Sequence, residues 1–506
     1  MPRTDWLSRN ARYAPDDPAL VWMPTGRRLS YADLDAAGCR LAAGLAERFG
    51  LAKGDRIAVL AENSLEHVLL FAAAQKAGFV LVPLNYRLAP PEVAYLIEDS
   101  DPHVLFAAAD FRDTAEAAAA SVPVVDLDAV EDMIDAADGG RGDGAGPARA
   151  SVDLDDPLMI LYTSGTTGRP KGAIISHKMI FWNSVNTELR LDLTARDRSF
   201  NAAPFYHTGG WNVLLTPFLH HGATTYLFSG FDADAILRLC DDEALTVLWG
   251  VPTMLKMMAD SELFDDVSLE SVRYAVVGGE AMPEPLIRTW QEKGVPIRQG
   301  FGMTEVGVNC FSLPERDALR KIGSIGFPNF YIDTRVVDED GADVPSGETG
   351  ELLMRGPVVT PGYWRDPDAT AEAIDEDGWF HTGDLVEVDD EGYFYVVGRK
   401  KEMYISGGEN VYPAEIESVL YDHDAVSEAA VLGVPDDRWG ETGAAFLVVD
   451  AVDAGADLDA EAIRRFCRER LAKYKVPRHV RFLDELPKGS SGKIDRQALR
   501  ESFETA

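Results

Sequence analysis

The spacing of hydrophobic positions predicts alternating helices and strands near the start of the chain. Apolar residues in 31–45 recur at helical intervals, and Ser30 precedes them as a helix cap. Short apolar runs at 56–60 and 79–83 are typical of buried strands, and a helical pattern over 68–77 lies between them. This order predicts a βαβ unit, in which a helix connects neighbouring parallel strands.

From residue 151 the chain repeats the order of strand and then helix. The Ala-rich run 107–120, which precedes this region, is also predicted to be helical. Such alternation favours an α/β architecture with largely parallel sheets. The predicted strands are 158–163, 224–228, 245–250 and 273–278, and a helix is predicted over 283–294.

After residue 330 the pattern becomes richer in short strands bounded by turns. Strands are predicted at 334–337, 350–355 and 392–398, which indicates an antiparallel or barrel-like subdomain. Beyond residue 400 lie about 100 residues, a normal size for a small domain. Helices at 413–421 and 460–473, with strands at 425–434, 444–449 and 480–482, make this segment a compact α+β unit.

Length, charge and glycine content refine this picture. A chain of 506 residues exceeds the size of a single core, so two or more domains are expected. The Gly-rich run 139–146 is predicted to be a flexible surface loop. A formal net charge of −36 repels nucleic acid and anionic lipid, so neither a nucleic acid nor a membrane is expected as a partner.

The four cysteines are scattered and form no C-x-x-C pair, so no zinc site is predicted. The N-terminus lacks the apolar region of a signal peptide. No apolar run reaches the roughly 20 residues needed to cross a bilayer. We therefore expect a soluble cytoplasmic protein with reduced thiols.

Candidate chemistry concentrates in residues 161–173, which follow an apolar strand. The run contains glycines, four Ser or Thr hydroxyls and Lys171, in the order Tyr162-Thr-Ser-Gly-Thr-Thr-Gly-Arg-Pro-Lys171. Backbone N–H groups and hydroxyls that follow one another form a cradle for anions, and the lysine adds a charge. The run lacks the spacing of a Walker A loop. It predicts a site for a nucleotide polyphosphate.

This run resembles the phosphate-binding motif of the acyl-adenylate-forming enzymes, which include acyl- and aryl-CoA synthetases, peptide-synthetase adenylation domains and beetle luciferases. Further motifs follow in the order of that family and extend the resemblance to nearly the whole chain. They are Gly278-Gly-Glu280, Gln299-Gly-Phe-Gly-Met-Thr-Glu305, Gly347-Glu-Thr-Gly-Glu351, Trp379-Phe-His-Thr-Gly-Asp384, Gly398-Arg-Lys-Lys-Glu402, Ser406-Gly-Gly-Glu-Asn-Val-Tyr-Pro413 and Ser491-Gly-Lys-Ile494.

The resemblance implies a large N-terminal domain and a small mobile C-terminal domain. The large domain is expected over 1–399, with stacked, mostly parallel sheets and a small barrel-like subdomain. The family's hinge residue corresponds to Lys401, so the hinge is expected at 400–401. The α+β domain is then expected over 402–506.

The resemblance also implies an ATP-dependent acid–thiol ligase that uses Mg²⁺ and coenzyme A. A carboxylic acid, fatty or aromatic, would first form an acyl-AMP with release of pyrophosphate and then pass to CoA. The acceptor could instead be a carrier-protein thiol, oxygen or another nucleophile. A relative that only binds a nucleotide is a further alternative, and the retention of Lys493, Glu305 and Asp384 argues against it. A homodimer is compatible with the resemblance.

Residues are assigned to the nucleotide by their positions in the motifs. Phe301 is expected to stack on adenine, at a position where the family more often has tyrosine, and Thr304 is expected near the α-phosphate. Asp384 is expected to accept the ribose hydroxyls, with Arg399 beside it. The remaining residues implied to bind ATP are Thr163, Ser164, Gly165, Thr166, Thr167, Gly168, Lys171, Gly278, Gly279, Glu280 and Gly302.

Three residues are assigned to the chemical steps. Lys493, on a Gly/Ser loop, is expected to bridge the acid's carboxylate and the α-phosphate. Glu305 is the expected Mg²⁺ ligand, with Thr163 as its partner, because Mg²⁺ prefers oxygen ligands. His207 matches a family histidine between the acyl and nucleotide pockets, where proton transfer and orientation of the carboxylate both remain open.

The acid and CoA are assigned to further residues. The CoA arm is expected to contact Gly407, Gly408, Trp439 and Lys475, although Lys473 and Lys475 also fit a solvated pair of charges at a helix end. The acid pocket is expected to be mostly apolar. Its predicted lining residues are Phe181, Trp182, Trp211, Asn212, Val277, Gly300, Val306 and Val308.

Overall fold

The computed structural model describes residues 4–138, 151–163, 169–406, 409–436, 439–449, 458–489 and 493–504. The chain divides into two compact units. The first unit contains Met1–Thr334 and Met354–Phe380, and the second contains Arg335–Leu353 and His381–Ala506. The second unit therefore begins before the hinge expected at 400–401, and the hinge itself stays a prediction.

A six-stranded sheet in the first unit carries the strand that leads into the candidate phosphate site. Its order is β6-β5-β3-β4-β7-β8, and its neighbours are parallel except for the antiparallel pair β7/β8. The strands are β3 (Arg56–Leu60), β4 (Val80–Leu84), β5 (Val104–Ala107), β6 (Val124–Asp126), β7 (Pro157–Thr163) and β8 (Lys171–Ser176). The predicted strands at 56–60, 79–83 and 158–163 are thus confirmed within a residue or two.

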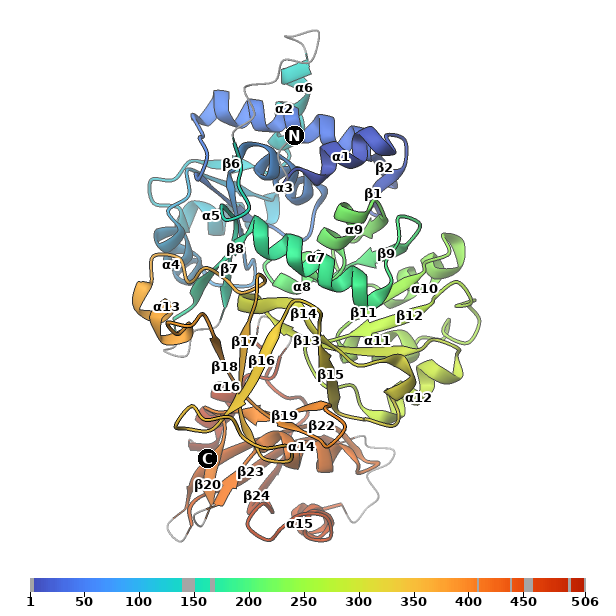
Figure 1. The fold of residues 1–506 in the computed structure, drawn as a ribbon, viewed down its shortest axis with the longest axis vertical. Coiled ribbons are helices and arrows are strands. Elements are labelled where there is room, and N and C mark those ends of the chain that lie inside the picture. The colour runs from blue at the N-terminus through green and yellow to red at the C-terminus, as the bar shows by residue number, and fades with distance from the viewer. Residues whose placement is uncertain are drawn as a thin grey trace. The chain divides into compact units, whose positions relative to one another are not determined.

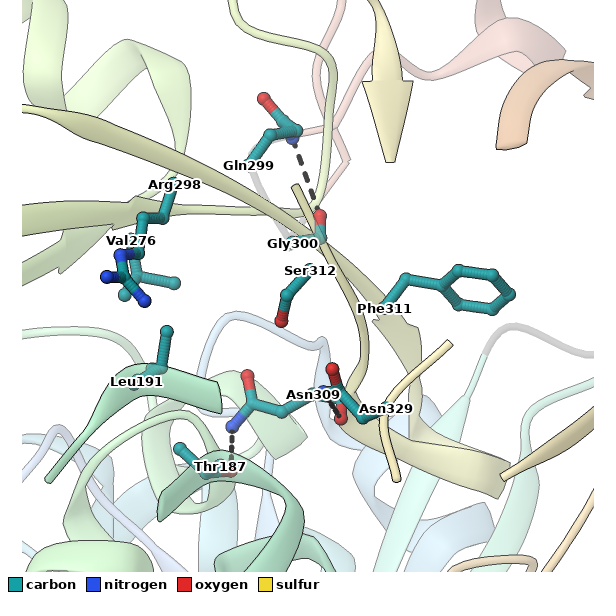
Figure 2. A pocket seen from close by; sticks show the side chains of 10 residues that line it. All are labelled: Thr187, Leu191, Val276, Arg298, Gln299, Gly300, Asn309, Phe311, Ser312 and Asn329. Atoms are coloured by element: carbon teal, nitrogen blue, oxygen red, sulfur yellow. Dashed lines mark hydrogen bonds between the residues drawn. The ribbon is translucent and has the colours of Figure 1, made fainter. Parts of the chain in front are cut away.

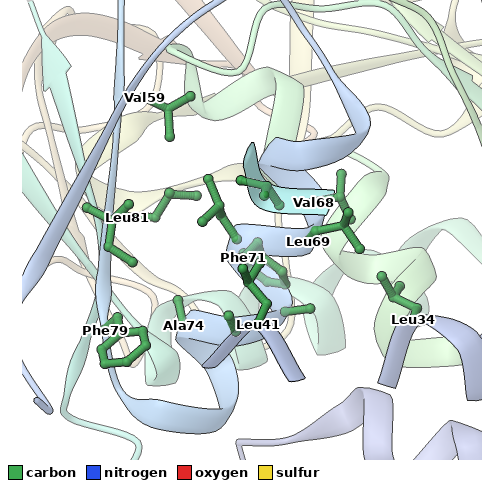
Figure 3. Packing of buried hydrophobic residues seen from close by; sticks show 14 of the residues in the cluster. Leu34, Leu41, Val59, Val68, Leu69, Phe71, Ala74, Phe79 and Leu81 are labelled. Carbon is green, nitrogen blue, oxygen red and sulfur yellow. The ribbon is translucent and has the colours of Figure 1, made fainter. Parts of the chain in front are cut away.

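Helices α2 (Tyr31–Phe49) and α3 (Leu65–Ala77) pack side by side next to this sheet (Figure 1). Ser30 caps α2 through a capping box with Asp33, as its place before the apolar pattern predicted. Figure 3 shows Leu41 and Phe71 meeting in the core that these helices share with the sheet. Continuous burial of α3 explains its nearly all-apolar sequence.

Two more groups of strands belong to the first unit. A four-stranded sheet has the order β2-β1-β10-β9. A second group runs β11-β12-β13-β14-β15, parallel from β11 to β13 and antiparallel from β13 to β15. The strands are β1 (Pro18–Trp22), β2 (Arg27–Ser30), β9 (Arg198–Asn201), β10 (Thr224–Leu227), β11 (Val247–Gly250), β12 (Tyr274–Val277), β13 (Ile297–Met303), β14 (Gly307–Ser312) and β15 (Ser324–Pro328).

The other helices of the first unit connect and cover these strands (Figure 1). They are α1 (Trp6–Tyr13), α4 (Pro90–Ser100), η1 (Ala109–Phe111), α5 (Arg112–Ala118), α6 (Ala129–Asp138), α7 (His177–Leu191), α8 (Thr208–Asn212), α9 (Leu215–His221), α10 (Ala233–Asp242), α11 (Pro252–Ala259), α12 (Glu284–Glu292), η2 (Thr304–Val306), η3 (Glu315–Asp317) and α13 (Pro367–Ala373). Among the described residues, no helix combines the length and the apolar character that crossing a membrane requires.

The second unit contains the strand-rich region and the α+β segment. Strands β16 (Asp333–Val337), β17 (Gly350–Arg355), β18 (Phe380–Val388) and β19 (Phe394–Arg399) neighbour one another in the order β19-β18-β17-β16. The rest comprises β20 (Tyr404–Ser406), β21 (Glu409–Val411), α14 (Pro413–Tyr421), β22 (Val426–Asp436), β23 (Gly440–Val449), α15 (Ala460–Arg468), β24 (His479–Phe482) and α16 (Arg496–Glu504). The predicted α/β fold with a large N-terminal part and a smaller C-terminal part is confirmed.

Two predicted helices are too long. The run 107–120 contains the end of β5, the short η1 and α5, and Ala120 adopts a positive φ of 48° that ends the helical path. The helix predicted over 460–473 ends at Arg468, because the chain then turns and packs Leu471 and Tyr474 against the core. The loop predicted at 139–146 lies outside the described residues.

Candidate nucleotide and acid site

The Gly-rich run joins two paired strands. Strand β7 ends at Thr163 and β8 begins at Lys171, and these two residues are partners in the antiparallel register. Ser164, Gly165, Thr166, Thr167 and Gly168 lie outside the described residues. The pairing brings the first and last predicted phosphate ligands of the run together at the edge of the sheet.

Glu305 lies beside this edge, although it is far away in the sequence. The Thr163 hydroxyl donates to Glu305 Oε1 over 3.2 Å, and the Tyr363 hydroxyl donates to the same oxygen over 3.1 Å. Glu305 is only 6 % exposed. The structure therefore joins the two predicted metal ligands, Thr163 and Glu305, in one hydrogen-bonded group.

A protein-only metal cage is not found in the described part of the chain. No group of three or more His, Cys, Asp or Glu side chains there could hold an ion. Mg²⁺ keeps several water or phosphate ligands and often takes only one or two protein oxygens. Glu305 and Thr163 fit a Mg²⁺ ion that reaches the site together with a nucleotide.

Short glycine-containing turns form the predicted adenine side. Gly278 and Gly279 follow β12, and Gly279 has a φ of +89°, which only glycine adopts easily. The Gln299 side chain holds this turn, because its amide donates to the Glu280 carbonyl over 3.0 Å and accepts from the Met282 N–H over 3.2 Å. Sequence reasoning assigned no role to Gln299.

Phe301 and Gly302 lie on the next strand, β13. The half-buried Phe301 ring meets Phe311 edge to face, with 5.8 Å between the ring centres. A Cβ atom on Gly302 would approach the Val308 carbonyl oxygen to 2.3 Å, so only glycine fits there. Thr304 opens the short helix η2, directly before Glu305. The motif thus places an aromatic face and the metal carboxylate along one short stretch.

His207 directly precedes the short helix α8 as its N-cap residue and is half-buried. Its ring lies 4.5 Å from the Tyr206 ring, and its carbonyl accepts from the Gly210 N–H over 3.1 Å. A Cβ atom on Gly210 would meet the Pro204 carbonyl oxygen at 2.4 Å, so the chain needs glycine to make this turn. The turn fixes the position of the histidine.

The predicted acid contacts differ in accessibility. The half-buried Trp182 ring packs against Tyr331 at 4.7 Å. Trp211 is 0 % exposed and stacks on Phe205 and Phe71 in the core. Its assignment as a substrate contact stays a prediction that this position does not support.

Three further predicted acid contacts are also buried. The Asn212 side chain is used by its own helix and the next one, since its amide donates to Thr208 of α8 over 3.1 Å and accepts from Thr216 of α9 over 2.9 Å. Val277 and Val306 have no exposed surface. Direct contact of these residues with a substrate therefore requires a movement of their neighbours.

Gly300 borders a small cavity between α7 and strands β12 to β14 (Figure 2). The space open to the centre of a water molecule is about 10 Å³, roughly the room that one water needs. Asn309 lines the cavity, and its side-chain amide donates to the Thr187 hydroxyl over 2.6 Å. The other lining residues are Leu191, Val276, Arg298, Gln299, Phe311, Ser312 and Asn329.

In the second unit, Asp384 and Arg399 form an ion pair. They are register partners on the antiparallel strands β18 and β19, and Arg399 Nε lies 2.5 Å from Asp384 Oδ1. The Asp384 side chain is 3 % exposed, whereas that of Arg399 is 50 % exposed. The Asp384 N–H also donates to the Thr382 hydroxyl over 3.0 Å. The two predicted ribose ligands are thus brought together.

Of the other described residues predicted for this unit, Lys493 and Trp439 are exposed and Lys475 is half-buried. Lys493 is exposed, and its carbonyl accepts from the Gly489 N–H over 2.8 Å. Trp439 is 41 % exposed. Lys475 forms an ion pair with Glu415 over 2.6 Å, which offsets part of the positive charge that was expected to attract CoA. Gly407 and Gly408 lie outside the described residues.

Comparison with known proteins places this arrangement in a family. A family model described as "AMP-binding enzyme" matches residues 7–364. The chain belongs to the AMP-binding enzymes. A second model, "AMP-binding enzyme C-terminal domain", matches residues 415–493. The resemblance drawn from the motifs is therefore confirmed.

The relatives of this AMP-binding enzyme span its whole length. It is 41 % identical to a feruloyl-CoA synthase of Amycolatopsis sp over 98 % of both chains. It is 40 % identical to an indoleacetate–CoA ligase of Aromatoleum aromaticum, over 99 % of this chain and 98 % of that one. A solved structure of O-succinylbenzoate coenzyme A synthetase from Bacillus subtilis, in complex with ATP and a magnesium ion, is 32 % identical with a TM-score of 0.87 and covers 98 % of this chain and 99 % of its own.

Proposed function

We propose that this AMP-binding enzyme activates an aromatic carboxylic acid with ATP and Mg²⁺ and then passes the acyl group to coenzyme A. Acid–CoA ligation itself is shown by the family match and by CoA-ligase relatives at 40–41 % identity along the full chain. The observation in the structure that carries the proposal is the contact between Thr163 and Glu305, which joins the Gly-rich run to the motif 299–305.

The reaction has two substitutions. First, a carboxylate oxygen of the acid attacks the α-phosphorus of ATP, and the bond from this phosphorus to the oxygen of the leaving pyrophosphate breaks. Next, the sulfur of CoA attacks the acyl carbon, the acyl C–O bond breaks, AMP leaves, and the thiol proton passes to water. Both steps concentrate negative charge, so the protein contributes mainly by positioning and by placing positive charge.

Residues of the first unit are assigned to the phosphates and the metal. Glu305 and Thr163 would hold Mg²⁺ by their oxygens, and Lys171 lies at the end of the same run. When bound, the ion supplies neutralisation of phosphate charge. Phe301 offers a half-buried ring for adenine, and His207 is assigned to the acid's carboxylate, where it orients the group or moves a proton.

Residues of the second unit are assigned to the ribose and to transfer. Asp384 accepts hydrogen bonds from the ribose hydroxyls beside Arg399, and the exposed residue Lys493 bridges the acid and the α-phosphate with its ammonium group. Trp439 and Lys475 are assigned to CoA. The proposed order of action requires a hinge at 400–401, which brings different residues of this unit to the ligands in turn.

The choice of an aromatic acid rests on the relatives and on one accessible ring. The names feruloyl-CoA synthase and indoleacetate–CoA ligase both refer to aromatic acids. The half-buried Trp182, with Tyr331 beside it, offers an aromatic surface to such a ring. A fatty acid remains the second substrate class, and a carrier-protein thiol the second acceptor.

A panel assay tests the proposal. The purified protein is given MgATP with phenylpropenoic, indolic and fatty acids, and pyrophosphate, AMP and acyl-CoA are quantified. We expect equal amounts of all three products, with the highest kcat/KM for an aromatic acid. If fatty acids are the best substrates, the proposed aromatic substrate class is wrong. If pyrophosphate is released but CoA is not consumed, CoA is not the acceptor.

Lys493→Ala tests the assignment of the transfer lysine. We expect acid-dependent pyrophosphate release to fall by roughly 100-fold or more, because removal of one charge-stabilising donor costs that much in comparable sites. ATP binding, measured by calorimetry, should stay within about threefold. Normal pyrophosphate release by the variant would refute the role of Lys493.

A further inference from the structure

We infer that Tyr363 is a positioning residue for the metal carboxylate: its hydroxyl fixes Glu305, and its ring lies beside Lys171. This inference rests on the proposed role of Glu305 in holding Mg²⁺ with ATP. Tyr363 lies outside all the motifs identified in the sequence, and 58 positions separate it from Glu305. The structure alone brings them together.

The hydrogen bonds at Glu305 are one-sided. Thr163 and Tyr363 both donate to Oε1, over 3.2 and 3.1 Å. Among the described residues, this leaves Oε2 without a hydrogen-bond donor from the protein. A carboxylate held by one oxygen presents the other in a fixed direction, which suits the binding of a single cation with demanding geometry.

The charge environment of Glu305 also favours a cation. The residue is almost buried, and none of the described lysine, arginine or histidine side chains forms an ion pair with it. Neutral hydroxyl donors lower the cost of burying the charge without cancelling it.

The backbone around Tyr363 is fixed to the strand that begins with Lys171. The Trp364 N–H donates to the Gly172 carbonyl over 2.7 Å, and Tyr363 forms a bridge with Ala173. The Tyr363 N–H donates to the Thr370 hydroxyl over 2.9 Å. A tyrosine anchored in this way moves little relative to β8.

The same turn holds the backbone of Glu305. The Thr360 N–H donates to the Glu305 carbonyl over 2.7 Å, and the Thr360 hydroxyl donates to the Ile174 carbonyl on β8, also over 2.7 Å. The turn therefore fixes both the backbone and the carboxylate of the proposed metal ligand to one strand. The Lys171 ammonium lies 5.4 Å from the centre of the Tyr363 ring, which couples the lysine to the same support.

Tyr363→Phe removes the hydroxyl and keeps the ring. We expect the Mg²⁺ concentration needed for half-maximal binding of a non-hydrolysable ATP analogue to rise about 10-fold, since supporting groups around metal ligands have effects of that size. Binding is read from the thermal shift at each Mg²⁺ concentration, so the readout does not depend on turnover. The pyrophosphate-exchange rate at saturating Mg²⁺ should recover most of the wild-type value.

Tyr226→Phe is the matched control. The Tyr226 hydroxyl donates to the Glu243 carboxylate over 2.7 Å, so this variant loses the same kind of bond elsewhere in the first unit. Its Mg²⁺ requirement should equal that of the wild type. Thr360→Val, which removes the hydroxyl bond from the same turn to the Ile174 carbonyl and changes no proposed metal ligand, should raise the requirement as Tyr363→Phe does and replaces that variant if it does not fold.

A double-mutant comparison separates positioning from general stability. In a Glu305→Gln background, Tyr363→Phe should change the Mg²⁺ requirement less than twofold, because the charged acceptor is gone. A folded Tyr363→Phe protein with the wild-type Mg²⁺ requirement would overturn the inference. A wild-type protein whose ATP binding ignores Mg²⁺ would instead overturn the proposed metal role of Glu305.

Discussion

Two buried carboxylates are assigned to the nucleotide, and their surroundings differ. Glu305, in the first unit, accepts from the neutral hydroxyls of Thr163 and Tyr363. Asp384, in the second unit, faces the guanidinium group of Arg399 at 2.5 Å. No cationic side chain of the described residues forms an ion pair with the first carboxylate, which favours a metal ion. The charge of the second is already paired, so neutral donors such as ribose hydroxyls suit it better.

The difference shows how similar residues acquire different chemistry. Both side chains are nearly inaccessible, so burial alone does not separate their roles. The charge of the nearest donor separates their roles, because a cation binds weakly beside a guanidinium group and strongly beside a carboxylate that has no cationic partner. Substitutions that change only charge therefore test the comparison directly.

Glu305→Gln should have the largest effect. The amide keeps the size of the side chain but cannot replace a charged metal ligand, so kcat/KM for MgATP should fall by about 100-fold. The loss should shrink when Mg²⁺ is raised. Calorimetry with ATP in the absence of Mg²⁺ should show wild-type affinity, and a loss there would mean that Glu305 contacts the nucleotide itself.

Asp384→Asn should have a smaller effect of a different kind. It leaves Arg399 without its carboxylate and removes a charged acceptor for the ribose, so KM for ATP should rise roughly 10-fold. The Mg²⁺ requirement, measured in the same titration as for Glu305→Gln, should not change. An altered Mg²⁺ requirement in this variant would remove the distinction between the two carboxylates.

Three histidines of the first unit, the buried His67 and His177 and the half-buried His220, limit the pH range for these tests. Burial lowers the pKa of His67 and His220 to about 3 and that of His177 to about 4, from the usual 6.5. Between these values the unfolded chain binds protons that the folded protein does not, so stability decreases as pH falls below 6.5. Each histidine contributes up to about 1.4 kcal/mol per pH unit.

Denaturant unfolding at pH 7, 6 and 5 checks this expectation. The free energy of unfolding should decrease toward pH 5, and His67→Gln should reduce the slope by about one histidine's share. An unchanged slope in this variant would show that His67 takes up its proton without unfolding. Nucleotide binding should therefore be compared at neutral pH, where the fold is intact.

Local signals in the sequence predicted most of the elements that support the site. The cap at Ser30 and the apolar run of β7 depend on residues that are neighbours in the sequence, and both predictions are confirmed. The motif order gave the family, which the family model confirms. The predictions for the helices at 107–120 and 460–473 were too long, because the turns that end them, such as the one at Ala120, depend on packing rather than on helix propensity.

Contacts between distant residues could not be predicted in this way. Tyr363 and Gln299 support the candidate site through hydrogen bonds to partners 58 and 19 positions away, and no spacing rule connects them. Trp211 shows the opposite problem. It is predicted to line the mostly apolar acid pocket, yet its ring completes the core. An aromatic residue near a motif fits both roles until its neighbours are known.

Transfer of oxygen from the acid tests the acyl-adenylate mechanism most directly. A substrate acid labelled with ¹⁸O in both carboxylate oxygens is incubated with the enzyme, MgATP and CoA, and the AMP is analysed by mass spectrometry. Because a carboxylate oxygen attacks the α-phosphorus and the acyl C–O bond breaks later, the AMP should carry one ¹⁸O atom. Unlabelled AMP, or ADP in place of AMP, would contradict the account.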